Sequence, residues 1–187
     1  YYYHIVALRR IGRNTEAQTK CKEFIQKFPK DEMVSSIALI LGDISQEREE
    51  FPEAIAHYKW VQANVANLTP EVAEEIDFRI AACLFSQVDW APASKAFEAF
   101  LKKYERSSVR QQVLYMNALC SFFQGKYKET KIDFDKYQQE YPKGQFIPDV
   151  RYRQAIVKFG VNPPDIAGTI KLCEDWLKDY AKDRTDE

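Results

Sequence analysis

KEFIQKFPKD at residues 22–31 and DKYQQEYPKG at residues 135–144 share one sequence pattern. In both stretches aromatic residues stand at the third and seventh positions and proline at the eighth. Self-similarity at long range is the signature of a repeat architecture.

This pattern belongs to the second half of a sequence repeat that occurs five times. A small residue is followed by larger, mostly apolar residues four, seven and eleven positions later, and successive sets are 37, 39, 37 and 39 residues apart. These offsets place all four residues on one face of an α-helix. We name this predicted helix B. The sets are Ala17, Cys21, Phe24, Phe28; Ala54, Tyr58, Val61, Val65; Ala93, Phe97, Phe100, Tyr104; Thr130, Phe134, Tyr137, Tyr141; and Thr169, Cys173, Trp176, Tyr180.

The first half of the unit is periodic as well, and we name it helix A. A bulky residue is followed three positions later by a small one, and these pairs recur at 39, 37 and 37 residues. Tyr2 and Ile5 precede them in the same register, with the small residue replaced. Glycine and proline, which end helices, lie between the halves. The pairs are Leu39/Gly42, Phe78/Ala81, Tyr115/Ala118 and Tyr152/Ala155.

A single helix pair cannot bury its apolar face, whereas stacked pairs share one continuous core. The sequence therefore predicts an all-α fold, a right-handed α-solenoid of about five antiparallel helix pairs. We expect one repeat domain over residues 1–187, and we expect it to be a piece of a longer chain because it opens without methionine. The predicted units are 1–31, 32–70, 71–107, 108–144 and 145–187.

The second helix of each unit resembles that of tetratricopeptide repeats. In WAPASKAFEAFLKKY (90–104) and YKETKIDFDKYQQEYP (127–142), a small residue is followed by an aromatic residue four positions on. The second stretch also has the family's Gly-x-Tyr turn at Gly125 and its closing proline at Pro142. The period exceeds the usual 34 residues, and helix A matches the family poorly. The long units with Phe-Pro and Tyr-Pro endings are most similar to bacterial envelope members, such as outer-membrane-assembly lipoproteins and Tol–Pal partners.

The residue types that carry catalysis do not form a recognisable set. His4 and His57 are the two histidines, and neither stands at the spacing of a metal ligand or a nucleophile pair. No glycine-rich phosphate loop, HExxH or GxSxG motif is present. A net charge of −1 also argues against nucleic acid, because nucleic-acid binders need a basic excess. We expect no enzyme, cofactor, metal, nucleic-acid partner or membrane span in this chain.

The four cysteines are predicted to be unpaired. Cys83 and Cys120 occupy equivalent places in consecutive A helices and point the same way, while Cys21 and Cys173 occupy equivalent core places in helix B. No CxxC motif suggests zinc. Free thiols favour a reducing compartment, whereas the resemblance favours the bacterial envelope or periplasm, so envelope and cytoplasm both stay open.

The remaining prediction is a protein-binding surface. In the family that the chain resembles, helix A lines a groove that holds a peptide or a partner helix. Only Asn117 comes near that family's carboxylate clamp, so recognition of a C-terminal acidic tail is not predicted. The same residues also form the apolar stripe of helix A, so a core role is the alternative, and it carries more of the weight. A second hypothesis is a structural spacer that self-associates through its ends. The predicted partner-binding row is Phe78, Gln112, Tyr115, Asp149 and Tyr152, with Phe85, Phe122 and Phe159 two turns beyond it.

Overall fold

A computed structural model describes residues 1–65 and 68–180. Over these ranges the chain forms ten α-helices and no strand, which confirms the predicted all-α fold. It divides into two compact units, Tyr1–Asp89 and Trp90–Glu187, which are described separately. The single-domain organisation stays a prediction.

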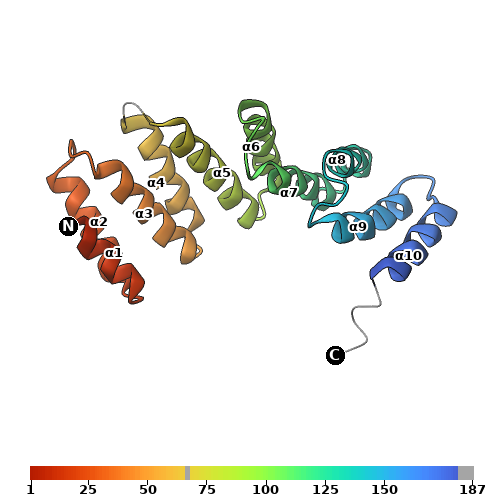
Figure 1. Cartoon of the computed structure of the whole chain (residues 1–187), viewed down its shortest axis with the longest axis horizontal. Coiled ribbons are helices and arrows are strands. Elements are labelled where there is room, and N and C mark those ends of the chain that lie inside the picture. The colour runs from red at the N-terminus through yellow and green to blue at the C-terminus, as the bar shows by residue number, and fades with distance from the viewer. Residues whose placement is uncertain (66–67, 181–187) are drawn as a thin grey trace. The chain divides into compact units, whose positions relative to one another are not determined.

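In each unit the helices pack mainly on their neighbours in sequence, as antiparallel pairs (Figure 1). Odd-numbered helices correspond to helix A and even-numbered helices to helix B. The first unit contains α1 (Tyr2–Arg10), α2 (Asn14–Lys27), α3 (Val34–Glu47), α4 (Phe51–Asn64) and α5 (Pro70–Ser86). The second unit contains α6 (Trp90–Lys103), α7 (Arg110–Phe123), α8 (Tyr127–Glu140), α9 (Ile147–Gly160) and α10 (Ile166–Tyr180).

Four of the five turns from helix A to helix B end the first helix in the same way. One residue takes a left-handed conformation, and the amide after it donates to the carbonyl five residues earlier, which is the Schellman motif. The left-handed residues are Gly12, Glu49, Val88 and Gly125, with φ of +77°, +61°, +65° and +69°. The fifth turn, 161–165, is two residues longer than the others, as the 39-residue spacing predicts.

The core follows the predicted periodicity. In the first unit, Ile5 and Leu8 of α1 pack with residues of α2 and α3, and a second cluster joins α3, α4 and α5. Cys21, Phe97 and Phe134, at equivalent places in α2, α6 and α8, are completely buried. α3 and α7 are the helices with the most buried residues in their units, and each packs on both of its neighbours in sequence.

Two details of the predicted helix B face are wrong. The fourth residue of the set is only partly buried or exposed, since Phe28 and Tyr141 are the caps that follow the helix. In the fifth unit the face is less buried than predicted, because Cys173 is exposed and Thr169, Trp176 and Tyr180 are only partly buried. Cys173 is exposed rather than a core cysteine, whereas Cys21, Cys83 and Cys120 are buried, and all four thiols are free.

Candidate binding surface

The structure joins two residues of the predicted row. The Tyr115 hydroxyl of α7 donates to Oδ2 of Asp149 on α9 at 2.7 Å, and its ring stacks on Phe146 with centroids 4.1 Å apart. Burial, followed by this hydrogen bond, raises the pKa of Tyr115 to about 12. Asp149 also accepts from Nε of Arg153 at 2.5 Å. Tyr115 and Asp149 are therefore engaged in the junction between two A helices.

The other members of the row lie apart from that junction. Gln112 is exposed, and its closest polar contact is with Sδ of Met116 at 3.9 Å. Tyr152 is 50% exposed, and its ring lies 5.9 Å from that of Trp176. Phe78 is half-buried in α5 and belongs to the other unit. Gln112 and Tyr152 are thus the members most accessible to a partner.

The aromatic residues two turns further along also differ in exposure. Phe85 and Phe122 are half-buried, whereas Phe159 is 59% exposed. The guanidinium of Arg153 lies over the ring of Phe122 at 5.1 Å, so the next helix A covers this ring. No equivalent side chain is described over Phe159. Of these three aromatic residues, Phe159 on α9 is therefore the one most accessible to a partner.

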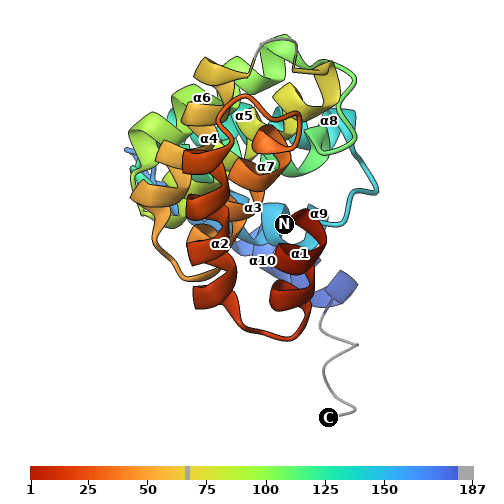
Figure 2. The same ribbon diagram turned by 90° about the vertical axis from the view of Figure 1, so that its left-hand side faces the viewer.

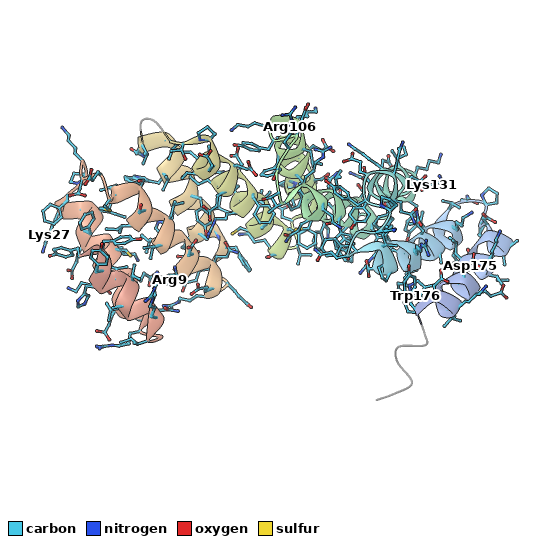
Figure 3. The ribbon with its side chains drawn as sticks, viewed as in Figure 1. Arg9, Lys27, Arg106, Lys131, Asp175 and Trp176 are labelled. Carbon is cyan, nitrogen blue, oxygen red and sulfur yellow. The ribbon has the colours of Figure 1, made fainter. Side chains whose placement is uncertain are left out.

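In the first unit, Asp43 of α3 is the centre of a polar network. It forms ion pairs with Arg79 of α5 and with Arg9 of α1, the latter at 3.5 Å, and it accepts from the Tyr58 hydroxyl at 2.9 Å. The Arg9 side chain is labelled in Figure 3. Burial raises the pKa of the Asp43 carboxyl, and Arg79 opposes that change. Each of these charges has a partner, and the network links three A helices.

Asn117, the residue closest to the family's carboxylate clamp, is largely buried. It is 7% exposed, and its side-chain oxygen accepts from Ser94 of α6 at 2.9 Å. It lies at the junction between α6 and α7, where this hydrogen bond already engages its side chain.

Two small cavities were not predicted from the sequence. Each lies between two successive B helices, over the helix A that separates them, and they measure about 220 Å³ and about 230 Å³. The seven residues of the first stand 76 residues before seven of the second, which is two repeat steps. The first is lined by Lys22, Ile25, Gln26, Ala38, Leu41, His57 and Trp60. The second is lined by Glu98, Leu101, Lys102, Arg110, Leu114, Asn117, Asp133 and Lys136.

The chemistry of the two cavities differs. Leu41 and Trp60 in the first correspond to Asn117 and Lys136 in the second. Both volumes are below the roughly 300–1,000 Å³ of small-molecule sites, so each suits one side chain of a partner rather than a whole ligand. His57 lies in the first cavity, and burial lowers its pKa.

Equivalent serines in α3 and α7, the helices that line the two cavities, have different hydrogen-bond partners. Ser121 Oγ donates to Oδ2 of Asp133 at 3.0 Å. Ser45, its counterpart two repeats earlier, is fully buried, and no partner for its hydroxyl is found among the described residues. The position of Asp133 is occupied there by His57.

The described residues contain no group of three or more His, Cys, Asp or Glu side chains that could hold a metal ion. None of the helices described is long and apolar enough to cross a lipid bilayer.

No protein-family model matches the chain, and no curated protein matches it. Among solved structures, the chain is similar to a tetratricopeptide repeat protein from Parabacteroides merdae, with 14% sequence identity and a TM-score of 0.47. The alignment covers 94% of this chain and 77% of that one. The helix pairs and their repeated turns are tetratricopeptide-like, and the envelope subtype stays a prediction.

Proposed function

We propose that the chain is a non-enzymatic scaffold that binds a peptide or a partner subunit through its A helices. The observation that carries this proposal is that Gln112 and Tyr152 stay accessible on α7 and α9 while the surrounding polar groups are paired with one another. Exposed aromatic residues are the usual anchors of protein interfaces. An accessible tyrosine among polar groups that already have partners is better suited to binding a protein than to catalysis.

Within the predicted row, Tyr115 and Asp149 have a supporting role. Their mutual hydrogen bond fixes α7 against α9, and so it fixes the distance between Gln112 and Tyr152. Phe78 would contribute a separate contact from the first unit.

Selection from a phage-displayed library of random peptides tests the proposal. We expect enriched peptides whose affinity falls about tenfold or more when Tyr152 is replaced by alanine, since an aromatic anchor contributes about 2 kcal/mol. Gln112→Ala should weaken binding less. The matched control is Ile132→Ala on α8, whose side chain is 67% exposed on a B helix.

Two results would contradict the proposal. One is a selection that enriches no peptide. The other is a set of enriched peptides that bind Tyr152→Ala and the unmodified chain equally well.

A further inference from the structure

The first inter-repeat cavity has an apolar interior that belongs to the core. Ala38 and Leu41 of α3 are buried, and Ile25 of α2 and Trp60 of α4 pack against both core clusters of the first unit. α3 contacts both α2 and α4, and the three helices are labelled in Figure 2. The walls of the cavity are therefore held in place by the core, and a partner does not have to form them.

Water in this cavity finds few polar partners on these apolar walls. A buried water molecule normally makes about three hydrogen bonds, so replacing such water by an apolar group is favourable. The cavity measures about 220 Å³, which is below the roughly 300–1,000 Å³ of small-molecule sites. Its size and lining suit one large apolar side chain.

Two side chains that can carry a positive charge line the cavity from opposite helices, Lys22 on α2 and His57 on α4. Lys22 is exposed and His57 is half-buried, and neither forms a hydrogen bond or an ion pair with another described residue. Burial lowers the pKa of His57, and the charge of Lys22 lowers it further, so the two side chains repel each other when both are protonated. A carboxylate near both would relieve that repulsion.

None of the described acidic residues lines this cavity. Five acidic residues lie on α2, α3 and α4, and one of them, Glu53, acts on His57 less than Lys22 does. The other four are already in ion pairs, namely Glu16 with Arg13, Glu23 with Lys20, Asp43 with Arg9 and Arg79, and Glu47 with Arg9. The place beside Lys22 and His57 is thus left for a carboxylate from outside the chain.

The second inter-repeat cavity lacks this arrangement. Glu98 and Asp133 stand there at the places of Lys22 and His57, so two carboxylates replace the two basic groups. Basic residues line it as well, so it carries both signs of charge: Lys102, Arg110 and Lys136. The first cavity is lined by one sign of charge, which gives it a defined preference.

We propose that the first inter-repeat cavity binds one large apolar side chain of a partner protein, and that an acidic residue next to it in the partner pairs with Lys22 and His57. The apolar walls supply the attraction, and the charges select among partners that share the same anchor. This surface lies between B helices of the first unit. The inference goes beyond peptide binding by the A helices and does not rest on it.

A panel of synthetic pentapeptides, blocked at both ends, tests the proposal. Each has leucine, phenylalanine or tryptophan at its centre, flanked on both sides by aspartate, asparagine or lysine. Binding is followed by NMR of the ¹⁵N-labelled chain, whose three tryptophans give three indole signals, and Trp60→Phe identifies that of Trp60. Peptide is added up to about 10 mM, because a single anchor gives roughly millimolar affinity.

We expect the aspartate-flanked peptides to move the indole signal of Trp60 and to leave those of Trp90 and Trp176 in place. The asparagine-flanked peptides should bind about fivefold more weakly, since an exposed ion pair is worth up to about 1 kcal/mol, and the lysine-flanked peptides more weakly still. This comparison uses the unmodified chain and needs no variant to fold.

Reversal of one charge gives a second test. Lys22→Glu should weaken binding of the aspartate-flanked peptides about tenfold and strengthen binding of the lysine-flanked ones, because it replaces an attraction by a repulsion. The matched control is Lys27→Glu, an exposed lysine of the same helix that does not line the cavity. At physiological salt, which screens charges beyond about 8 Å, it should change the affinity less than about twofold.

The pH dependence identifies the part played by His57. A bound carboxylate favours its protonated form, so binding of the aspartate-flanked peptides should tighten about two- to fivefold between pH 7.5 and pH 5. The peptide aspartates, with an ordinary pKa of about 3.9, stay largely ionised over this range. His57→Gln should remove the effect.

Three results would overturn the proposal. One is a Trp60 signal that no peptide moves, and another is equal binding of the aspartate-flanked and asparagine-flanked peptides. The third is a Trp60 signal that shifts with the concentration of the chain alone, because a second copy would then fill the cavity.

Discussion

Gly42 of α3 marks a close approach of two helices in the first unit. A methyl group built on it would lie 2.5 Å from Cε1 of Tyr58, whose side chain is fully buried. The tyrosine cannot move aside, because its hydroxyl is within hydrogen-bonding distance of Asp43 at 2.9 Å and Gln46 at 3.0 Å. The small member of the Leu39/Gly42 pair is therefore small because the ring of Tyr58 occupies the space beside it.

We expect Gly42→Ala to lower the free energy of unfolding by about 1–3 kcal/mol, because it overpacks this contact. The intrinsic preference of helices for alanine acts in the opposite direction by about 1 kcal/mol and is outweighed. Urea denaturation measures the difference. In a Tyr58→Leu background the steric conflict is relieved, so the same change should become neutral or stabilising; an equal loss in both backgrounds would refute the explanation.

Ser45 and Ser121 form a matched pair for a second prediction. Ser45→Ala removes a buried hydroxyl that has no described partner and should raise the free energy of unfolding by about 1 kcal/mol. Ser121→Ala removes the donor to Asp133 and should lower it by about 1–2 kcal/mol at neutral pH.

The pH dependence of the Ser121 variant follows from Asp133. Burial raises the pKa of this carboxyl, and the Ser121 hydrogen bond to its charged form lowers it. The hydrogen bond therefore stabilises the fold above the pKa of Asp133, and that contribution is lost as the carboxyl is protonated. Chemical denaturation at pH 7 and at pH 3 should show the Ser121→Ala deficit shrinking at the lower pH; a constant deficit would argue against this role.

At the scale of elements, the turn after helix A shows what the sequence could and could not reveal. Gly12 and Gly125 mark two of the left-handed positions, since glycine adopts positive φ without a steric penalty. Glu49 and Val88 occupy the same position and give no such signal. The register of the repeat, rather than the residue type, identifies these two.

Val88 is β-branched, and its positive φ brings its side chain into steric conflict with the backbone. Because the side chain is 63% exposed, burial does not compensate for this cost. We expect Val88→Gly to raise the free energy of unfolding by about 0.5–1 kcal/mol, after allowing for the greater freedom of glycine in the unfolded chain. Thermal unfolding measures it. The reciprocal control, Gly125→Val, should be destabilising, and a destabilising Val88→Gly would show that the valine side chain has another role.

The helix A aromatic residues illustrate a limit of pattern reading. Tyr115 and Tyr152 occupy the same place in consecutive units, yet one is held by the next helix A and the other is half exposed. Periodicity specifies the face of a helix, but the presence of a following helix decides its burial. For the same reason Cys173 was predicted to be buried like Cys21 and is not.

Thiol reactivity should report this difference directly. At micromolar concentration, we expect one of the four cysteines, Cys173, to react rapidly with a disulfide reagent in the folded chain. Burial raises the pKa of Cys21 and Cys120 to about 12 and that of Cys83 to about 11, so these three should react only on unfolding. Cys173→Ser should abolish the rapid phase; two or more rapid thiols would contradict the packing described.

On the scale of the whole molecule, stability in each unit comes from contacts between neighbours in sequence. Elements with few buried side chains in such an array open most readily. Within the second unit, α7 lies between two helices and α10 has no buried residue.

We therefore expect the backbone amides of α10 to exchange with deuterium faster than those of α7, at a concentration low enough to keep the chain monomeric. Hydrogen-exchange mass spectrometry measures this, with α9 of the same unit as the intermediate case. Equal protection in α7 and α10 would mean that the last helix is held by contacts that its burial does not show.

The sequence was sufficient for the helices, their pairing and their register, because all three follow from the spacing of apolar residues. It was not sufficient for the candidate site. Which of Tyr115 and Tyr152 is accessible depends on contacts between helices, and the inter-repeat cavities depend on side chains from three helices at once. The division at Asp89 and Trp90 leaves no signal in the periodicity either.

The two inter-repeat cavities stand at equivalent places two repeats apart and have nearly equal volumes. The backbone of the repeat therefore sets the size of the indentation, and the side chains around it set its chemistry. Trp60 gives the first cavity an indole where Lys136 gives the second a cation. A fold of this kind can be diversified by exchanging side chains at a single repeat position while the helices stay as they are.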